Sequence, residues 1–86
     1  MISIIIILYN SKKYITKCLE SINENFTDDD KYEIILFNNN PNEKYSNKII
    51  KNNKIINSEK NIGYSKALNY CVTISKGEFI LTLNPD

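Results

Sequence analysis

The chain has 86 residues, and its 11 Lys or Arg against 10 Asp or Glu give a net charge of +1 at pH 7. Such a balance argues against nucleic acid or an anionic membrane as the main partner. The chain contains no His, which excludes Ser-His and Cys-His catalysis and His-ligated metals. An apolar fraction of 42% suffices for one small core, and two Cys are too few for a disulfide scaffold or a four-Cys zinc site.

The first predicted element is a strand over residues 2–8, which read ISIIIIL. A continuous β-branched run of this length is typical of a strand buried on both faces of a parallel sheet. The run is too short to span a bilayer, and it lacks the basic segment and the small-residue cleavage site of a signal peptide. We therefore expect a cytoplasmic protein with reduced thiols and no membrane span.

A helix is predicted over residues 12–25, after a turn and N-cap at Asn10 and Ser11. Its apolar positions recur at helical spacing and form one stripe, consisting of Tyr14, Ile15, Cys18, Leu19, Ile22 and Phe26. Because Cys18 lies in this stripe, we expect a core thiol rather than a reactive one. The acidic segment 27–30 then breaks the pattern and is interpreted as a solvated loop rather than a cation site.

The middle of the chain contains two shorter strands separated by polar segments. A second strand is predicted over residues 33–37, and the turn-forming residues Asn38 to Pro41 follow it. Tyr45, Ile49 and Ile50 lie at helical spacing, which predicts a weak short helix over residues 43–52. A third strand is predicted over residues 54–57, and a loop over residues 58–63.

The last part of the chain predicts a second amphipathic helix and a fourth strand. The helical stripe consists of Tyr64, Ala67, Leu68, Cys71 and Val72, so Cys71 is again expected in the core. The helix should stop near Lys76 and Gly77, with a cation in its last turn and glycine at the C′ position. The fourth strand is predicted over residues 78–83, and the chain ends in Asn84-Pro85-Asp86.

The order of these elements is β-α-β-α-β-α-β, which predicts a single Rossmann-like α/β domain. We expect a mostly parallel four-stranded sheet with helices on both faces. Ligands of such sheets bind outside the carboxyl ends of the strands, where the strand order reverses. The residues at those ends are Tyr9 to Ser11, Asn38 to Asn40, Ser58 to Gly63, Asn84 and Asp86.

These positions suit a ligand that carries phosphate, since helix N-termini favour anions. Gly63 and Gly77 are the only glycines, so neither a GxGxxG fingerprint nor a P-loop can be formed. A diphosphate bridged by a metal ion, with Asp86 as an oxygen ligand, is the alternative chemistry.

Five segments, taken in order, resemble inverting family 2 glycosyltransferases with the GT-A fold. The resemblance covers nearly the whole chain. The segments are ISIIIILYN at 2–10, YITKCLESI at 14–22, YEIILFNN at 32–39, NIGYSKALN at 61–69 and GEFILTLNPD at 77–86. They are similar to that family's opening strand, first helix, second strand and turn, Asn-x-Gly helix entry, and strand leading to the acidic metal motif.

The resemblance implies that residues 1–86 are the N-terminal, nucleotide-diphosphate-sugar-binding half of an enzyme that transfers a sugar to an acceptor hydroxyl. By position, the donor-binding residues it implies are Leu8, Tyr9, Asn10, Asn38, Asn61, Gly63, Lys66 and Asn84. The residues after the first strand would cradle the base, and Asn38 would contact the base or ribose. Asn84 and Asp86 match the motif that holds Mn²⁺ or Mg²⁺ against the diphosphate, with Asp86 as the metal ligand. A divalent ion there offsets the charge of the leaving nucleoside diphosphate.

Three positions depart from the family pattern. Ile7 stands where the first strand usually has proline, and the uncharged Asn38 replaces the acid of the second strand. Asn84 replaces the first acid of the metal motif. The resemblance places the acceptor half and the general base beyond Asp86, so no catalytic residue is assigned here, and we expect the chain alone to be inactive. A full-length enzyme would lie in the cytoplasm or at the inner face of the membrane.

The alternative interpretation is a non-catalytic α/β module that binds a partner or self-associates. The fourth strand would have an open apolar edge, which is a template for pairing with another chain and predicts a homodimer. A phospho-receiver domain shares the alternating pattern, but the first strand ends in Leu8-Tyr9-Asn10 rather than in the acidic pair that such a domain needs.

Overall fold

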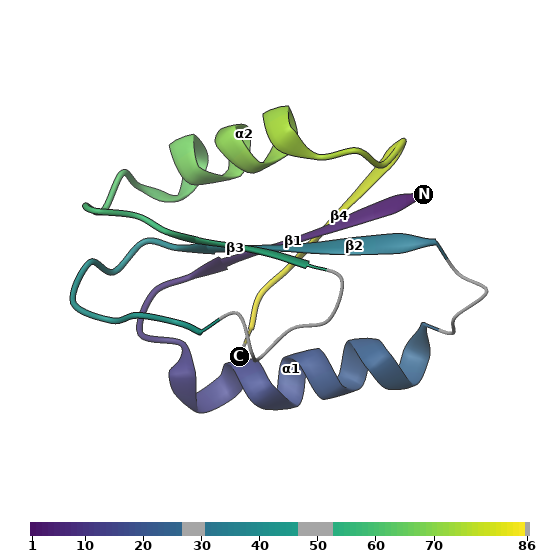
Figure 1. The fold of residues 1–86 in the computed structure, drawn as a ribbon, viewed down its shortest axis with the longest axis horizontal. Coiled ribbons are helices and arrows are strands. Elements are labelled where there is room, and N and C mark those ends of the chain that lie inside the picture. Colours follow the sequence, from purple (N-terminus) through teal and green to yellow (C-terminus); the bar gives the residue numbers. More distant parts are fainter. Residues whose placement is uncertain (27–30, 47–52, 86) are drawn as a thin grey trace.

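The computed structural model describes residues 1–26, 31–46 and 53–85, which form an α/β fold (Figure 1). The strands are β1 (Ile2–Leu8), β2 (Tyr32–Asn38), β3 (Asn53–Asn57) and β4 (Phe79–Leu83), and they form one parallel sheet in the order β3-β2-β1-β4. Helix α1 (Lys12–Asn25) lies on one face of the sheet and α2 (Tyr64–Ile74) on the other (Figure 1). The predicted Rossmann-like fold class is confirmed.

Two apolar layers hold the helices against the sheet. Alternate residues of a strand point to opposite faces, so Ile4 and Ile6 pack toward α1, whereas Ile5 packs toward α2. The stripe of α1 contributes Ile15, Leu19 and Ile22 as buried residues, and that of α2 contributes Ala67 and Cys71. These positions agree with the helical spacing of the sequence.

The two cysteines are free and have different surroundings. Cys71 is fully buried, as predicted, and burial raises the pKa of its thiol to about 11. Cys18 is half-buried against the α1 layer, and burial raises its pKa as well. Both thiols are therefore poorly ionised at neutral pH, which makes them weak nucleophiles.

The short helix predicted over residues 43–52 does not form over residues 43–46. The side chain of Asn57 accepts a hydrogen bond from the backbone N–H of Tyr45 and donates one to its carbonyl. The Asn38 amide donates to the carbonyl of Glu43. These side chains take up the backbone groups that a helix would pair, and they hold the segment in an irregular conformation. The rest of that prediction, and the acidic segment 27–30, lie outside the described residues.

The end of α2 also differs from the sequence-based prediction. The helix stops at Ile74, no basic residue lies in its last turn, and Ser75 at the C-cap is extended. Gly77 does not have the left-handed φ of a C′ glycine. Instead, a Cβ at Gly77 would lie 2.6 Å from the Ser3 backbone nitrogen and 2.8 Å from the Met1 carbonyl oxygen. Glycine is required there because two backbone segments approach closely.

The fourth strand lies at an edge of the sheet. β4 pairs with β1 on one side, and its apolar side chains Phe79, Ile80 and Leu81 are exposed. In the described ranges, neither helix is long and apolar enough to cross a membrane.

Candidate functional site

The strand order places a switch point between β1 and β4. The chain leaves β1 toward α1 on one face of the sheet, whereas it reaches β4 from α2 on the other face (Figure 1). The carboxyl ends of these adjacent strands are therefore not covered by a direct connection, and this is where open parallel sheets bind ligands.

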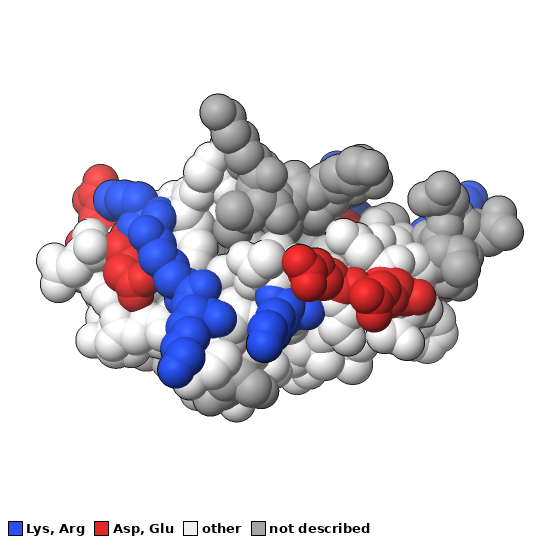
Figure 2. All heavy atoms as spheres, turned by 90° about the horizontal axis from the view of Figure 1, so that it is seen from below, with Lys and Arg blue, Asp and Glu red and all other residues white. Residues whose placement is uncertain are grey.

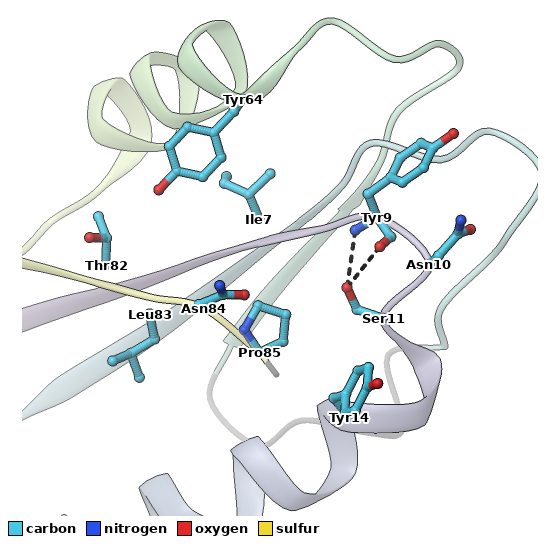
Figure 3. Close-up of a pocket in the computed structure, with 10 residues that line it drawn as sticks. All are labelled: Ile7, Tyr9, Asn10, Ser11, Tyr14, Tyr64, Thr82, Leu83, Asn84 and Pro85. Atoms are coloured by element: carbon cyan, nitrogen blue, oxygen red, sulfur yellow. Dashed lines mark hydrogen bonds between the residues drawn. The ribbon is translucent and has the colours of Figure 1, made fainter.

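A pocket of about 570 Å³ lies at this switch point (Figure 3). Its walls come from β1 and the loop after it, the first turns of α1 and α2, and the end of β4. The lining residues are Ile7, Tyr9, Asn10, Ser11, Tyr14, Tyr64, Thr82, Leu83, Asn84 and Pro85. None of these side chains carries a charge, and three of them are tyrosines. The pocket therefore offers aromatic surface and neutral hydrogen-bonding groups.

The loop after β1 is shaped by local hydrogen bonds. Asn10 has a φ of 55°, a left-handed conformation that Asn tolerates better than most residues. The Ser11 hydroxyl accepts a hydrogen bond from the Tyr9 N–H (3.1 Å) and donates one to the Tyr9 carbonyl (3.2 Å). These bonds close a tight turn that leads directly into α1, with Tyr9 and Ser11 on the pocket wall (Figure 3).

A buried tyrosine anchors this turn from beneath. The backbone N–H of Ser11 donates to the hydroxyl of Tyr45 at 3.2 Å. Burial and the charge of Glu43 raise the pKa of Tyr45, and the hydrogen bond from Ser11 only partly opposes them. Tyr45 therefore remains a neutral phenol that packs in the α1 layer.

Asparagine side chains tie the neighbouring loops together. Asn38 is fully buried; its amide nitrogen donates to Asn57 as well as to Glu43, and its oxygen accepts the Asn40 N–H. Asn39 accepts from the Ile62 N–H and donates to the Gly63 carbonyl. These bonds fix the loop that precedes α2, and so they place Tyr64 beside the pocket.

The structure brings three of the sequence-predicted residues together and leaves the others outside the pocket. Tyr9, Asn10 and Asn84 line it. Leu8 and Asn38 are fully buried and do not line it.

The predicted residues near α2 also lie outside the lining. Asn61 accepts from the Gly63 N–H, Gly63 has a φ of 85° at the N-cap of α2, and Lys66 is exposed on that helix. Asp86 lies outside the described residues.

Sequence reasoning missed several wall residues. Tyr14 and Tyr64 fall in the apolar stripes predicted from the sequence, yet Tyr64 is 59% exposed and both line the pocket. Both stand in the first turn of a helix that starts at the carboxyl edge of the sheet. That position is a signal for a pocket wall, but it is not sufficient alone, because Ile15 lies in the same turn of α1 and is buried in the core. Thr82 lies inside β4 and carried no signal.

The described residues hold no group of three or more His, Cys, Asp or Glu side chains that could bind a metal ion. On the face that α1 covers, acidic and basic side chains gather in separate patches, and neither sign dominates (Figure 2). This agrees with the near-zero net charge of the chain.

Comparison with known proteins gives the family. The model of glycosyl transferase family 2 matches residues 3–86. The crystal structure of S. aureus TarS 1-349 superposes with a TM-score of 0.82 at 28% identity, over 99% of this chain and 27% of TarS 1-349. A second S. aureus TarS structure gives a TM-score of 0.81 at 28% identity, over 99% of this chain and 16% of the other. No curated protein matches. The chain thus spans less than a third of these structures, and it belongs to glycosyl transferase family 2.

Proposed function

We propose that this chain is the donor-binding part of an inverting glycosyltransferase, taking a nucleotide-diphosphate-sugar whose sugar passes to an acceptor hydroxyl. The observation that carries the proposal is the pocket between β1 and β4 in a chain that belongs to family 2. A volume of about 570 Å³ lies within the range of small-molecule sites.

The chemistry of the pocket suits the neutral parts of such a donor. Tyr9 and Tyr64 are more than half exposed, so their rings are available to stack on a base or a sugar. Asn10 and Asn84 add amide groups that can donate or accept hydrogen bonds. Leu8, Asn38, Asn61 and Gly63 contribute by shaping the loops around the pocket, whereas Lys66 is an exposed cation on α2.

The phosphates of the donor require a positive partner, and none of the described lining residues provides one. A divalent ion supplies that charge and offsets the negative charge that develops on the leaving nucleoside diphosphate. The carboxylate of Asp86 and the amide oxygen of Asn84 are the hard oxygen ligands that Mg²⁺ and Mn²⁺ prefer. Magnesium commonly uses one or two protein ligands together with substrate phosphates and water, so this small donor set fits it.

A calorimetric titration with uridine, guanosine and thymidine diphosphates, each with Mg²⁺ or Mn²⁺, tests the proposal. We expect saturable binding of at least one nucleotide that weakens when the ion is chelated. The variant Thr82→Trp fills the pocket and should abolish binding, whereas Thr73→Trp, on the exposed side of α2, should not. Absence of binding to all three nucleotides would contradict the proposal.

The proposal includes inactivity of the chain alone. Inverting transfer needs a general base within reach of the acceptor hydroxyl. Among the residues that the structure describes, the lining contains no carboxylate, and Glu33 is engaged at the opposite end of the sheet. We expect no sugar transfer to a simple alcohol acceptor from a donor that binds. Transfer above the uncatalysed rate would show that the base lies within these residues.

A second candidate function rests on the β4 edge. Phe79 is 68% exposed, and the outer edge of β4 has no strand partner among the described residues. Such an edge favours a non-catalytic module that forms a homodimer by strand pairing. Sedimentation should then show a dimer that Leu81→Lys dissociates. A monomer at high concentration would exclude this homodimer.

The two free thiols support the expected cytoplasmic location, which labelling in cells would test.

A further inference from the structure

A second cavity, of about 300 Å³, lies beside the first turns of α1. Its lining residues are Lys12, Ile15, Thr16, Lys44, Tyr45 and Ser46, and none of them lines the pocket at the switch point. Ile15 and Tyr45 are buried, so they give the cavity an apolar floor. Lys12 and Lys44 are exposed and supply two ammonium groups. The cavity therefore combines an apolar floor with a cationic rim.

Both lysines are held in place by their neighbours. The Lys12 Nζ lies 5.6 Å from the centroid of the Tyr45 ring, within the range of a cation–π contact. Lys44 lies between two residues whose backbone groups are hydrogen-bonded. Asn57 bonds both the N–H and the carbonyl of Tyr45, and Asn38 donates to the carbonyl of the residue before Lys44. A ligand bound in this cavity would therefore have to order little of the backbone.

The positive charge around this cavity has no acidic partner in the described ranges. Residues 12–19 and 44–58 contain no Asp or Glu, and no described carboxylate forms an ion pair with Lys12 or Lys44. Glu43 precedes Lys44 but does not line the cavity. Along α1 the lysines lie in the first half and the glutamates in the second (Figure 2). This order opposes the helix dipole, which favours anions at the amino end, so an anion in the cavity would offset an unfavourable arrangement.

We propose that this cavity is a second binding site, which takes a phosphomonoester with a flat, apolar body. The phosphate contacts Lys12 and Lys44 at the rim, and the body rests on Ile15 and Tyr45. Two ammonium groups match the charge of about −1.5 to −2 that a phosphomonoester carries at pH 7, and lysine is a common phosphate ligand. The Thr16 hydroxyl adds a neutral hydrogen-bond donor. This inference does not depend on donor binding, because the two pockets share no lining residue.

An amide-resolved NMR titration of the chain with phenyl phosphate, phenol and inorganic phosphate tests the proposal. Phenyl phosphate should shift the amide signals of Lys12, Thr16 and Lys44 in a saturable way. Phenol lacks the charged group and inorganic phosphate lacks the apolar body, so each should bind more weakly than phenyl phosphate by about tenfold. The dispersion of the same spectra shows whether each variant is folded.

Variants of exposed lysines separate a built site from a general effect of charge. Lys12→Gln and Lys44→Gln each remove one ammonium group from the rim, and each should weaken phenyl phosphate binding by about tenfold. The matched control is Lys17→Gln, which removes the same charge from the same helix at an exposed position outside the lining. It should change the affinity by under about twofold. Thr82→Trp, which fills the donor pocket, should leave phenyl phosphate binding unchanged.

Shifts at the cavity that weaken in Lys12→Gln and Lys44→Gln, and persist in both controls, support the second site. The inference is overturned if phenyl phosphate gives no saturable shifts, if Lys17→Gln weakens binding as much as the rim variants, or if Thr82→Trp abolishes it. Inorganic phosphate that binds as tightly as phenyl phosphate would also overturn it, because the apolar floor would then play no part. Failure of the chain to bind any nucleotide would contradict the proposed function and leave this inference standing.

Discussion

The two ends of the sheet both carry polar side chains, but these side chains are hydrogen-bonded within the protein to different degrees. At the amino end, the Ser3 hydroxyl donates to the Glu33 carboxylate at 2.6 Å, and the Gly77 N–H donates to the Ser3 oxygen at 2.8 Å. The Lys76 N–H donates to the same Glu33 oxygen at 2.6 Å. This cluster joins β1, β2 and the segment before β4, and the close approach at Gly77 leaves no room for a ligand.

At the carboxyl end, the buried polar side chains are also hydrogen-bonded, but the side chains at the pocket rim are exposed. Asn38 and Asn39 are buried and paired, whereas no described residue pairs with the amide nitrogen of Asn10, and Tyr9 and Tyr64 are exposed. A network used for stability closes on itself, whereas a binding edge keeps groups available. Substitutions at the two ends should therefore separate stability from binding.

The largest loss of stability is expected for Gly77→Ala. The new Cβ would meet the Ser3 nitrogen and oxygen at 2.6 Å and the Met1 oxygen at 2.8 Å, and two of these atoms belong to the backbone and cannot turn away. Forced overpacking of this kind costs about 3 kcal/mol. Urea unfolding measures the loss, and nucleotide affinity per folded molecule should not change.

Gly63→Ala is the matched control at the other end of the sheet. A Cβ there meets nothing within 4 Å, but the φ of 85° is unfavourable for alanine. The expected cost is about 2 kcal/mol, from backbone strain alone, because a φ of 85° with a ψ of 162° is a conformation that essentially only glycine adopts. A loss equal to that of Gly77→Ala would mean that the close approach at the amino end is not tight.

Asn38→Asp should destabilise the carboxyl end by about 2 kcal/mol. It replaces a buried donor, which bonds the Glu43 carbonyl and Asn57, with an oxygen that faces two acceptors. Burial favours a protonated carboxyl there, which can donate again. The folded pKa is then raised, so the loss should be smaller at pH 4 than at pH 7. A more stable variant, or one with a constant loss from pH 4 to pH 7, would show that Asn38 does not act through its donor.

The fold was predictable because each apolar segment has a clear period. The bounds of β1 and α1 match the prediction, and β2 is longer by one residue at each end. The helix predicted over residues 43–52 does not form over residues 43–46, the part of it that the structure describes, because Asn38 and Asn57 bind the backbone around Tyr45, and such contacts between distant residues leave no local signal. The prediction that Gly77 ends α2 as its C′ glycine was wrong for a similar reason, since Met1 and Ser3, which approach Gly77 closely, are far away in sequence.

The site was predictable only where it follows from topology. Tyr9, Asn10 and Asn84 come directly after strands, and parallel strands bring their carboxyl ends to one edge. Tyr14 and Tyr64 satisfy the same helical spacing as core residues, so periodicity cannot separate a pocket wall from a packing face. The Asn40 contact with Asn10 joins two loops 30 residues apart, and it required the structure.

Glu33→Gln should cost about 1 kcal/mol near neutral pH, since a neutral acceptor replaces a carboxylate in two hydrogen bonds. Burial opposes ionisation of Glu33, but hydrogen bonds from Ser3 and Lys76 and the charges of Lys54 and Lys76 outweigh it, so its pKa is lowered. A lowered folded pKa stabilises the protein above the unfolded pKa of about 4.3, and this contribution is lost as the pH falls below it.

The pH dependence supplies the check on Glu33. The difference in unfolding free energy between wild type and Glu33→Gln should shrink between pH 5 and pH 3. Glu20→Gln, on the exposed side of α1, carries none of these hydrogen bonds and should cost under about 0.5 kcal/mol. A difference that grows on acidification would mean that the charge of Glu33 destabilises the fold.

The smallest loss of stability, and the sharpest contrast, is expected for Tyr64→Ala. Tyr64 lines the pocket and is 59% exposed, so its removal should change the unfolding free energy by under about 0.5 kcal/mol. The substitution removes an aromatic wall of the pocket, so nucleotide binding should weaken several-fold.

Tyr70→Ala on the same helix is the reciprocal control. The Tyr70 ring packs edge-on against Phe37 at 5.8 Å, away from the pocket lining, so its loss should cost about 1 kcal/mol and leave affinity unchanged. Equal effects of the two variants on the unfolding free energy and on nucleotide affinity would mean that Tyr64 and Tyr70 do not have separate roles in binding and packing.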